Sequence, residues 1–355
     1  MIEAATRDGS PLIDDRGATF VRLGAGPPPP LVGEWADYRP EGALPMAELA
    51  PGVWVGRTEL PVNAYVEYAY LVDGHRRADP LNRFPTSDGN GGRVSGLWMA
   101  RAPREAAQLG RLPARALPRG QLTRHRLETG RMVAGRTRTV TLYHPPDGEP
   151  ASDLLLVLDG QDYLVRQRLH RVADALIAGG RIAPIGIAFI HHGGDARFAE
   201  YGCSEGTLGF LADRIAPFAR ARLGIADRRV AIAGPSLGGL MALFAGLRRP
   251  DVFDRVLSQS GTFELPGREL VTSDLARHLP PTPIRVRLSV GTFEWLAGPV
   301  ARMADLLRAR GYDVIHRPYV GGHNHRAWAE DLIHGLESAF PPAGSGAAGG
   351  RPADG

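Results

Sequence analysis

One serine in the middle of the chain has the neighbours that a catalytic nucleophile requires. Gly234-Pro-Ser236-Leu-Gly238-Gly239 follows the apolar run Val230–Ala233 and precedes a run with helical spacing from Leu240. A serine at a sharp strand-to-helix turn has a strained backbone and needs small neighbours, and its hydroxyl projects beside the N-terminus of the helix. The pattern predicts that Ser236 is the nucleophile of acyl transfer, with an ordinary tight turn as the alternative interpretation.

A serine hydroxyl needs a base, and in hydrolases with this turn the order along the chain is serine, acid, histidine. Tyr319-Val-Gly-Gly-His323-Asn-His325 follows the last predicted strand and precedes the last predicted helix. Loops at the carboxyl ends of parallel strands are where such sheets bind ligands. We therefore expect His323 to be the base, with His325 as its rival and more typical of a helix cap.

The acid is expected after the strand that precedes the histidine loop. Gly291-Thr-Phe-Glu294 places a carboxylate there, and Glu294 would orient the imidazole and stabilise its protonated form. The alternative is an acid at a helix N-terminus, which the helix dipole favours. Asp305, inside a predicted helix, and Asp313, at the opposite end of a strand, are weaker candidates.

Acyl transfer also needs two N–H groups that stabilise the developing oxyanion. We expect one from Leu237, directly after the serine. The other is expected from Gly160 or Gln161, in the Asp159-Gly-Gln-Asp162 segment that follows the strand Leu154–Leu158. A plain turn between a strand and a helix is the alternative interpretation of this segment.

The second part of the chain alternates apolar strands with helical patterns, as a sheet that presents these loops requires. Short, fully apolar strands joined by helices predict a doubly wound, mostly parallel α/β sheet covered on both faces. The predicted strands are 139–143, 154–158, 185–190, 230–233, 256–258, 286–290 and 314–318, and the predicted helices are 164–178, 207–223, 237–247, 299–310 and 326–340.

The first part of the chain has a different pattern. The runs Phe20–Leu23, Gly52–Gly56 and Tyr65–Val72 are β-like and separated by turn residues, which predicts a small β-sandwich. The Arg-, Pro- and Ala-rich stretch 101–120 reads as a linker. We therefore expect a sandwich with its linker over 1–120, a catalytic domain over 121–340 and a disordered Pro- and Gly-rich tail over 341–355.

Composition excludes several classes of protein. The 42 basic residues are all arginine and are nearly balanced by 38 acidic residues, with no strongly basic stretch, which gives little support for a nucleic-acid partner. No run approaches the 18 apolar residues of a membrane span, and no signal peptide is visible, so a cytoplasmic protein is expected. The lone Cys203 and the absence of metal-ligand spacing predict neither disulfide nor metal, and no motif calls for a cofactor.

Several motifs together resemble the esterase family of α/β-hydrolases that contains the enterochelin (ferric enterobactin) esterases. The order and spacing of that family are found in Leu156-Val-Leu-Asp-Gly-Gln161, Gly234-Pro-Ser-Leu-Gly-Gly239, Val256-Leu-Ser-Gln-Ser-Gly261 and Gly321-Gly-His323 followed by Trp328. The early-set (immunoglobulin-like) sandwich that precedes the hydrolase in these esterases is similar to Pro30-Leu-Val-Gly-Glu-Trp35, Gly52-Val-Trp54, Val66–Gly74 and Asp79-Pro-Leu-Asn82.

The resemblance implies an α/β-hydrolase with Ser236 as nucleophile, His323 as base and Glu294 as acid. It also implies a substrate, a ferric triscatecholate trilactone cleaved in the cytoplasm to release iron. Arg197 matches a position near the pocket and would bind an anion bidentately. Phe263, the aromatic residue retained after Ser-Gln-Ser-Gly, and Trp328 would also contact the substrate.

Two departures from the family pattern concern the substrate. Glu264 adds a carboxylate that would repel a trianionic iron complex, and Asn324 stands where the family often has Asp after the histidine. An esterase or acyltransferase for acetylated or feruloylated carbohydrates therefore stays an alternative. A non-catalytic binding protein with this fold is the other.

Overall fold

The structure of the protein is a computed structural model that describes residues 2–88, 92–130, 133–146, 151–226 and 230–342. These residues group into two units. Unit 1 comprises Met1–Arg104, Val290–Ala297 and Pro318–Ala327, and unit 2 comprises Glu105–Ser289, Gly298–Arg317 and Trp328–Gly355. The sequence predicts a domain boundary near residue 120. In the structure the N-terminal segment of unit 1 ends at Arg104, and two later segments of the chain also belong to that unit. The predicted tail lies outside the described residues from 343 onward.

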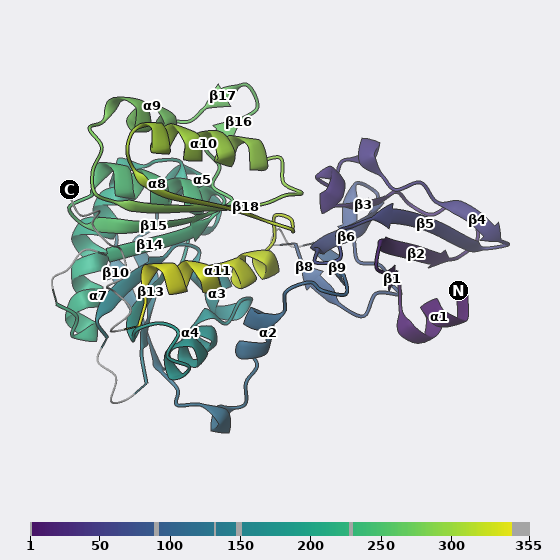
Figure 1. Ribbon diagram of the computed structural model, residues 1–355, viewed down its shortest axis with the longest axis horizontal. Helices are drawn as coiled ribbons and strands as arrows, with labels where there is room; N and C mark the ends of the chain where they lie inside the picture. The colour runs from purple at the N-terminus through teal and green to yellow at the C-terminus, as the bar shows by residue number, and fades with distance from the viewer. Residues whose placement is uncertain (1, 89–91, 131–132, 147–150, 227–229, 343–355) are drawn as a thin grey trace, which may run out of the picture. The chain divides into compact units, whose positions relative to one another are not determined.

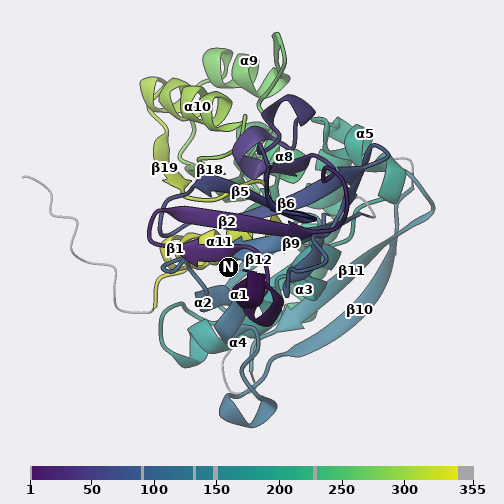
Figure 2. The same cartoon turned by 90° about the vertical axis from the view of Figure 1, so that its right-hand side faces the viewer.

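The N-terminal part of unit 1 is a pair of antiparallel sheets (Figure 2). After α1 (Ile2–Asp8), one sheet has the order β1-β2-β5-β4, with β1 at Leu12–Asp14, β2 at Gly17–Leu23, β5 at Val53–Glu59 and β4 at Ala47–Ala50. The other has the order β3-β6-β9-β8, with β7 paired to β6; these strands are β3 at Leu31–Gly33, β6 at Tyr65–Val72, β7 at His75–Arg77, β8 at Pro85–Ser87 and β9 at Arg93–Trp98. Phe20 from the first sheet and Tyr68 from the second meet edge to face, 4.8 Å apart, in a shared apolar core. This is the predicted sandwich.

Two segments that are distant in sequence complete unit 1. They are Val290–Ala297 and Pro318–Ala327, which begin with the last residues of β18 (Arg285–Gly291) and β19 (Asp313–Tyr319) and continue into the loops after them. Phe293 from the first loop and Val320 from the second pack against the sandwich core, and Gly321 forms a β-bridge with Tyr65. The sandwich therefore supports the two loops that carry the predicted acid and base.

Unit 2 contains an eight-stranded sheet of the order β10-β11-β13-β12-β14-β15-β18-β19 (Figure 1). Its strands are β10 (Gln121–Glu128), β11 (Thr137–His144), β12 (Asp153–Val157), β13 (Ile185–Ile190), β14 (Val230–Pro235), β15 (Phe253–Gln259), β18 (Arg285–Gly291) and β19 (Asp313–Tyr319). The neighbouring strands β13, β12, β14, β15 and β18 are parallel to one another. β11 pairs antiparallel with β13, and β10 pairs antiparallel with β11, so these two strands form an antiparallel edge. The predicted doubly wound, mostly parallel fold is confirmed.

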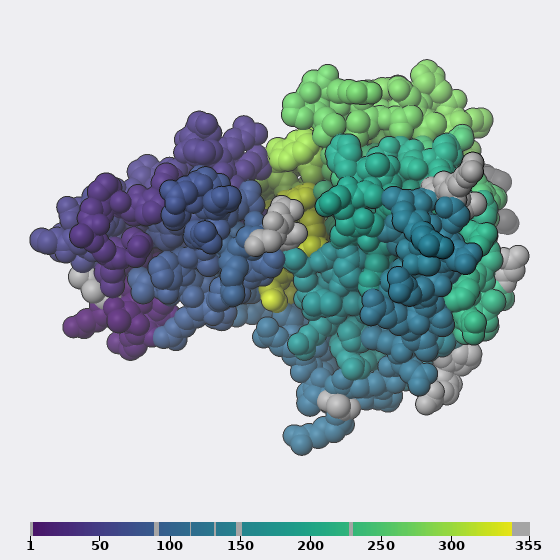
Figure 3. Space-filling view, turned by 180° about the vertical axis from the view of Figure 1, so that it is seen from behind, coloured from purple at the N-terminus to yellow at the C-terminus, as the bar shows by residue number. Residues whose placement is uncertain are grey.

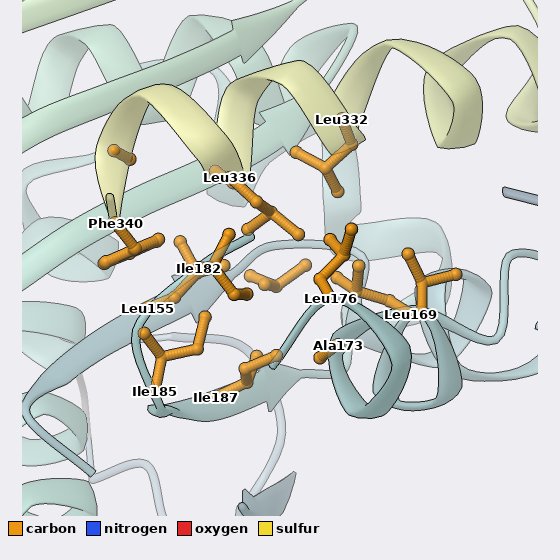
Figure 4. Close-up of a cluster of buried hydrophobic side chains, with 14 of the residues drawn as sticks. Leu155, Leu169, Ala173, Leu176, Ile182, Ile185, Ile187, Leu332, Leu336 and Phe340 are labelled. Carbon is orange, nitrogen blue, oxygen red and sulfur yellow. The ribbon is translucent and has the colours of Figure 1, made fainter. Parts of the chain in front are cut away.

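Helices cover this sheet on both faces, as the alternation of its side chains requires. On one face, Leu257 of β15 belongs to the core formed with α4 (Leu169–Ala178) and α11 (His325–Ala339), which Figure 4 shows around Leu155, Ile187 and Leu336. On the other face, Val256 lies against Gly246 of α8 (Leu237–Arg248). The remaining helices of unit 2 are α2 (Glu105–Leu109), α3 (Gly160–Val165), α5 (Arg197–Tyr201), α6 (Glu205–Gly209), α7 (Ala216–Leu223), α9 (Val271–His278) and α10 (Ala297–Ala309).

Two helices that the sequence predicts as continuous are interrupted. The segment 164–178 is divided between α3 and α4, because Arg168 has a positive φ of 51° and so leaves the right-handed helical region. The segment 207–223 becomes α6, a π-helical turn at Phe210–Ile215 and α7, where Pro217 in the first turn of α7 has no N–H to continue the ladder.

A buried ion pair and its hydrogen bonds join the last helix, α11, to strands β15 and β18. Asp331 of α11 accepts hydrogen bonds from Arg287 (2.6 and 2.8 Å) and Ser289 (2.5 Å) on β18 and from Gln259 (3.2 Å) on β15. Burial acts to raise the pKa of this carboxyl, but the bonds from Arg287 and Ser289 hold the pKa below its usual value. α9, α10 and the hairpin of β16 (Glu264–Leu265) and β17 (Arg268–Glu269) lie along one edge of unit 2, at the top of Figures 1 and 3.

Candidate active site

Ser236 lies at the turn between β14 and α8 in a backbone conformation that is rare outside glycine. Its φ of 56° and ψ of −120° cost conformational energy, and its neighbours hold it there. The Ser236 amide donates to the Gln259 carbonyl at 2.8 Å, and the Ser236 carbonyl accepts from the Thr262 amide at 3.3 Å. The side chain is half-buried, so the strained turn presents a hydroxyl that is not enclosed in the core.

Position 234, two residues before the serine, has no room for a side chain and therefore requires glycine. A Cβ at Gly234 would lie 2.6 Å from the backbone carbonyl carbon and oxygen of Gly238, closer than non-bonded atoms can approach. The backbone on the two sides of Ser236 therefore closes to direct contact only with glycine at residue 234. This is the steric requirement that the sequence pattern predicts.

The predicted oxyanion donors all occupy first turns of helices in unit 2. Leu237 is the first residue of α8, and Gly160 and Gln161 are the first two residues of α3. The parent strands β12 and β14 are parallel neighbours, so both helices begin at the same edge of the sheet. First-turn amides have no partner inside their own helix, and the helix dipole adds positive potential there. These amides are available to an anion bound at this edge.

His323 and Glu294 form a direct pair within unit 1. The imidazole Nδ1 lies 2.6 Å from Glu294 Oε2, a distance at which Nδ1 donates its proton to the carboxylate. The Glu294 side chain is 1% exposed, whereas the His323 side chain is 39% exposed. A buried carboxylate thus orients an imidazole that solvent or a substrate can reach.

The other oxygen of Glu294 is held by its own loop. Oε1 accepts from the Gly291 amide at 2.7 Å and from the Tyr319 hydroxyl at 3.4 Å. The weaker acid candidates have other partners: Asp305 pairs with Arg308, and Asp313 with Arg285, both with well-exposed carboxylates. Of the three predicted acids, Glu294 is the one that the structure pairs with His323.

The rival base has a different place in the fold. His325 is the first residue of α11 and is half-buried. The cap of that helix is Asn324, whose Oδ1 accepts from the Ala327 amide at 2.8 Å. His325 therefore belongs to the first helical turn, next to the cap.

The two aromatic residues predicted to contact the substrate are buried in the structure. Phe263 is 1% exposed and Trp328 is 4% exposed, so both rings are part of the interior. Trp328 Nε1 also donates to Ser260 Oγ at 2.9 Å. Both rings are therefore largely enclosed by the protein, and their contact with a substrate stays a prediction.

Arg197, which is predicted to bind an anion, is paired with a carboxylate of the protein. Its Nε donates to Asp159 Oδ1 and its Nη2 to Asp159 Oδ2, both at 2.6 Å, and Asp159 is buried. One bidentate edge of the guanidinium is therefore occupied by a carboxylate of the protein. Glu264 is neutralised in the same way, by Arg302 at 2.6 and 2.9 Å, so its expected repulsion of an anionic ligand is reduced.

Unit 1 has a pair of cations that the sequence reading does not single out. The guanidinium groups of Arg104 and Arg326 lie 5.4 and 5.1 Å from the ring centroid of Trp98. Tyr65 packs on the same indole at 4.5 Å. Arg326 stands three residues after His323, so positive charge and an aromatic ring accompany the histidine loop.

Glu34 is a second residue that sequence reasoning missed. It is 4% exposed, and both its oxygens accept from Asn324 Nδ2, at 3.1 and 2.9 Å. The two residues are 290 positions apart in the sequence, so no local pattern could reveal the contact. The only signal is Glu34's place in the Gly-Glu-Trp run of the sandwich.

Nowhere in the ranges that the structure describes do three or more His, Cys, Asp or Glu side chains gather in a way that could hold a metal ion. In the same part of the chain, none of the helices has both the length and the apolar character needed to cross a bilayer.

Comparison with known proteins places this geometry in a family. The sequence model of the esterase family, described as "Putative esterase", matches residues 131–339. An iron(III) salmochelin esterase of Escherichia coli O6:H1 is 29% identical over 315 residues, which are 83% of this chain and 73% of that protein. An iron(III) enterobactin esterase of Dickeya dadantii is 31% identical over 280 residues, 73% of this chain and 64% of that protein.

A solved structure shares the fold over both parts of the chain. The enterobactin esterase from Shigella flexneri, crystallised in the presence of enterobactin, aligns with a TM-score of 0.75 over 92% of this chain and 94% of its own, at 22% identity. The family model covers more than half of the chain. The chain belongs to this esterase family and is a hydrolase that acts on ester bonds.

Proposed function

We propose that this chain is a serine esterase that opens the ester bonds of an iron-siderophore trilactone through an acyl-enzyme. The observation that carries the reaction type is the strained Ser236 at the head of α8. The oriented His323–Glu294 pair supplies the base that such a serine needs. The substrate class is supported by the relatives, which are named for iron(III) salmochelin and iron(III) enterobactin.

In the proposed reaction, Ser236 Oγ attacks the ester carbonyl while His323 Nε2 takes the hydroxyl proton. Glu294 keeps the Nδ1 proton in place and stabilises the imidazolium. The oxyanion receives N–H bonds from Leu237 and from Gly160 or Gln161. The alcohol leaves with the proton from His323. Water then attacks the acyl-enzyme by the same steps, giving one acid and one alcohol for each ester hydrolysed.

The contribution of the acid can be measured with Glu294→Gln. Glutamine fills the same space, but it cannot stabilise the imidazolium with a negative charge, and it can favour the wrong tautomer of His323. We expect kcat on a p-nitrophenyl ester to fall by about 10²- to 10⁴-fold, less than on loss of the serine. Asp313→Asn, at an exposed carboxylate, is the control. Wild-type turnover in Glu294→Gln would assign Glu294 to structure alone.

The substrate class is tested with a panel of purified esters. Ferric enterobactin, a feruloylated sugar, an acetylated sugar and a neutral p-nitrophenyl ester are compared by kcat/KM, and the products are identified by mass spectrometry. Preference for the ferric trilactone supports the proposal. Cleavage of the sugar esters with no cleavage of trilactones would assign the chain to carbohydrate esters and leave the serine mechanism intact.

A trianionic substrate also predicts a charge effect. Because Arg197 is already paired with Asp159, the offsetting charge is expected from Arg326 beside Trp98. Arg326→Gln should raise KM for the ferric trilactone about 5- to 20-fold and leave KM for the neutral ester unchanged, with added salt weakening only the charged substrate. Arg308→Gln on α10 is the control. An equal change for both substrates would remove Arg326 from charge recognition.

We also propose that the reaction takes place in the cytoplasm, where the released iron would be used. The proposal is supported by the resemblance of the whole sequence pattern to the enterochelin esterases. Cell fractionation followed by immunoblotting of the native chain tests it, and recovery in an extracytoplasmic fraction would contradict it.

A further inference from the structure

The sandwich contributes a buried carboxyl to the loop that carries the predicted base. Glu34 follows β3 in a short 3-10 turn, Glu34–Ala36, and its side chain is directed into unit 1. Its Oε2 accepts from the Glu67 amide of β6 at 2.8 Å. The carboxyl is thereby anchored to the central strand of its own sheet.

On its other side, Glu34 holds Asn324, the residue directly after His323. The Asn324 Nδ2 group donates to both oxygens of Glu34, at 3.1 and 2.9 Å, while its Oδ1 caps α11. Asn324 is 4% exposed, so both ends of its amide are paired in the interior. The side chain consequently links a sandwich residue to the start of the helix that follows the histidine loop.

The same carboxyl also lies against the residue before His323. A Cβ at Gly322 would stand 2.2 Å from Glu34 Cδ, so the carboxyl packs directly on the Gly322 backbone. Any larger residue at position 322 would displace either the loop or the carboxyl. Glu34 therefore contacts the chain on both sides of His323, at residues 322 and 324.

The acid loop is fastened to this base loop by backbone bonds. The Phe293 amide donates to the Gly321 carbonyl at 3.1 Å, and the Thr292 amide donates to the Tyr319 carbonyl at 2.9 Å. Displacement of the 321–324 segment would thus change both the position of His323 and its distance from Glu294. A displacement of about 1 Å at a reacting group can cost on the order of 10²-fold in rate.

The surroundings of Glu34 disfavour a negative charge on its carboxyl. Burial, followed by the repulsion of Glu67, raises the pKa of Glu34 well above its ordinary value, and Glu294 adds to the effect.

We propose that Glu34 is a positioning residue for the catalytic loop, which acts through Asn324 and Gly322 to hold His323 against Glu294. The inference rests on the proposed role of His323 as the base. It means that the N-terminal sandwich is part of the catalytic apparatus, although Glu34 itself does not touch the reacting atoms.

The test is a double-mutant cycle with Glu34→Ala and Asn324→Ser. Serine keeps the helix cap but is too short to replace the amide that donates to Glu34. Each single variant should lower kcat on a p-nitrophenyl ester about 10- to 100-fold with less than a twofold change in KM, and the double variant should lose little more than either single one. Glu34→Gln, which keeps the acceptor for Glu67 and Asn324, should retain kcat within about threefold.

Asp79→Ala is the matched control for a general loss of stability in the sandwich. Asp79 is 2% exposed and accepts from the Tyr68 hydroxyl at 2.8 Å, outside the loop contacts just described. It should lower the melting temperature and leave kcat at the working temperature unchanged. A fall in kcat equal to that of Glu34→Ala would assign the effect to stability and overturn the proposal.

A spectroscopic measurement separates this inference from the proposed function. The downfield proton resonance of His323 Nδ1, assigned by its absence in His323→Ala, should shift or broaden in Glu34→Ala and Asn324→Ser and stay unchanged in Asp79→Ala. If His323→Ala keeps full turnover, the base assignment fails while the resonance still reports on positioning. An unchanged resonance and wild-type kcat in both loop variants would overturn the role of Glu34.

Discussion

Replacement of Ser236 by alanine should lower ester turnover by about 10⁴- to 10⁶-fold while the protein remains folded. The size of the effect follows from the covalent mechanism, since no other group can form the acyl-enzyme once the hydroxyl is lost. Alanine removes a single oxygen, and the backbone bonds to Gln259 and Thr262 that hold the turn are kept. Initial rates on a p-nitrophenyl ester and the circular dichroism spectrum measure the two parts of the expectation.

Covalent labelling gives an independent measure of the same assignment. A fluorophosphonate should modify wild-type protein at Ser236, as shown by peptide mass spectrometry, and should not modify the alanine variant. Ser152→Ala, at an exposed serine before β12, serves as the control and should be labelled normally. Labelling at another residue, or normal turnover without Ser236, would contradict the nucleophile assignment.

Replacement of His323 by alanine should cost almost as much as loss of the serine, about 10⁴-fold or more. The double variant with Ser236→Ala should be little worse than either single variant, because the two groups act in one proton transfer. Initial-rate and single-turnover kinetics of the three variants measure these effects.

His325→Ala is the matched control for the histidine prediction. It removes an imidazole two residues away, at the first position of α11, and leaves the Asn324 cap in place. We expect a change in kcat of less than about fivefold, in line with a surface or first-turn role. A large loss in His325→Ala together with a small loss in His323→Ala would transfer the base role to His325.

The elements around the serine were predictable because they are local. Fewer than twenty residues contain the whole pattern: a strand of β-branched and aliphatic residues, glycine at 234 and 238, and helical spacing from Leu240. The structure has β14, the strained turn and α8 in those places. The pairing of Glu294 with His323 was also accessible from chain order, since each follows the end of a strand in the same sheet. Their catalytic roles stay predictions.

The substrate contacts were less predictable, because burial is a property of packing. Phe263 and Trp328 stand in motifs whose neighbours suggest a pocket, yet their rings fill the interior. Arg197 follows a strand as a ligand-binding arginine could, yet one edge of its guanidinium is paired with Asp159. The identity of a nearest neighbour in space, which decides each of these cases, is not encoded in the spacing along the chain.

By itself, the sequence determined the class of chemistry and the order of the elements: a doubly wound sheet with a nucleophile turn, preceded by a small sandwich, in an esterase family. These follow from periodicity, turn residues and motif order, which operate over a few tens of residues. Only the tertiary structure decided that the loops with Glu294 and His323 join the sandwich in one compact unit. The physical reason is that a buried carboxyl such as Glu34 must find hydrogen-bond donors wherever folding places them, and here the donor comes from Asn324, 290 residues away.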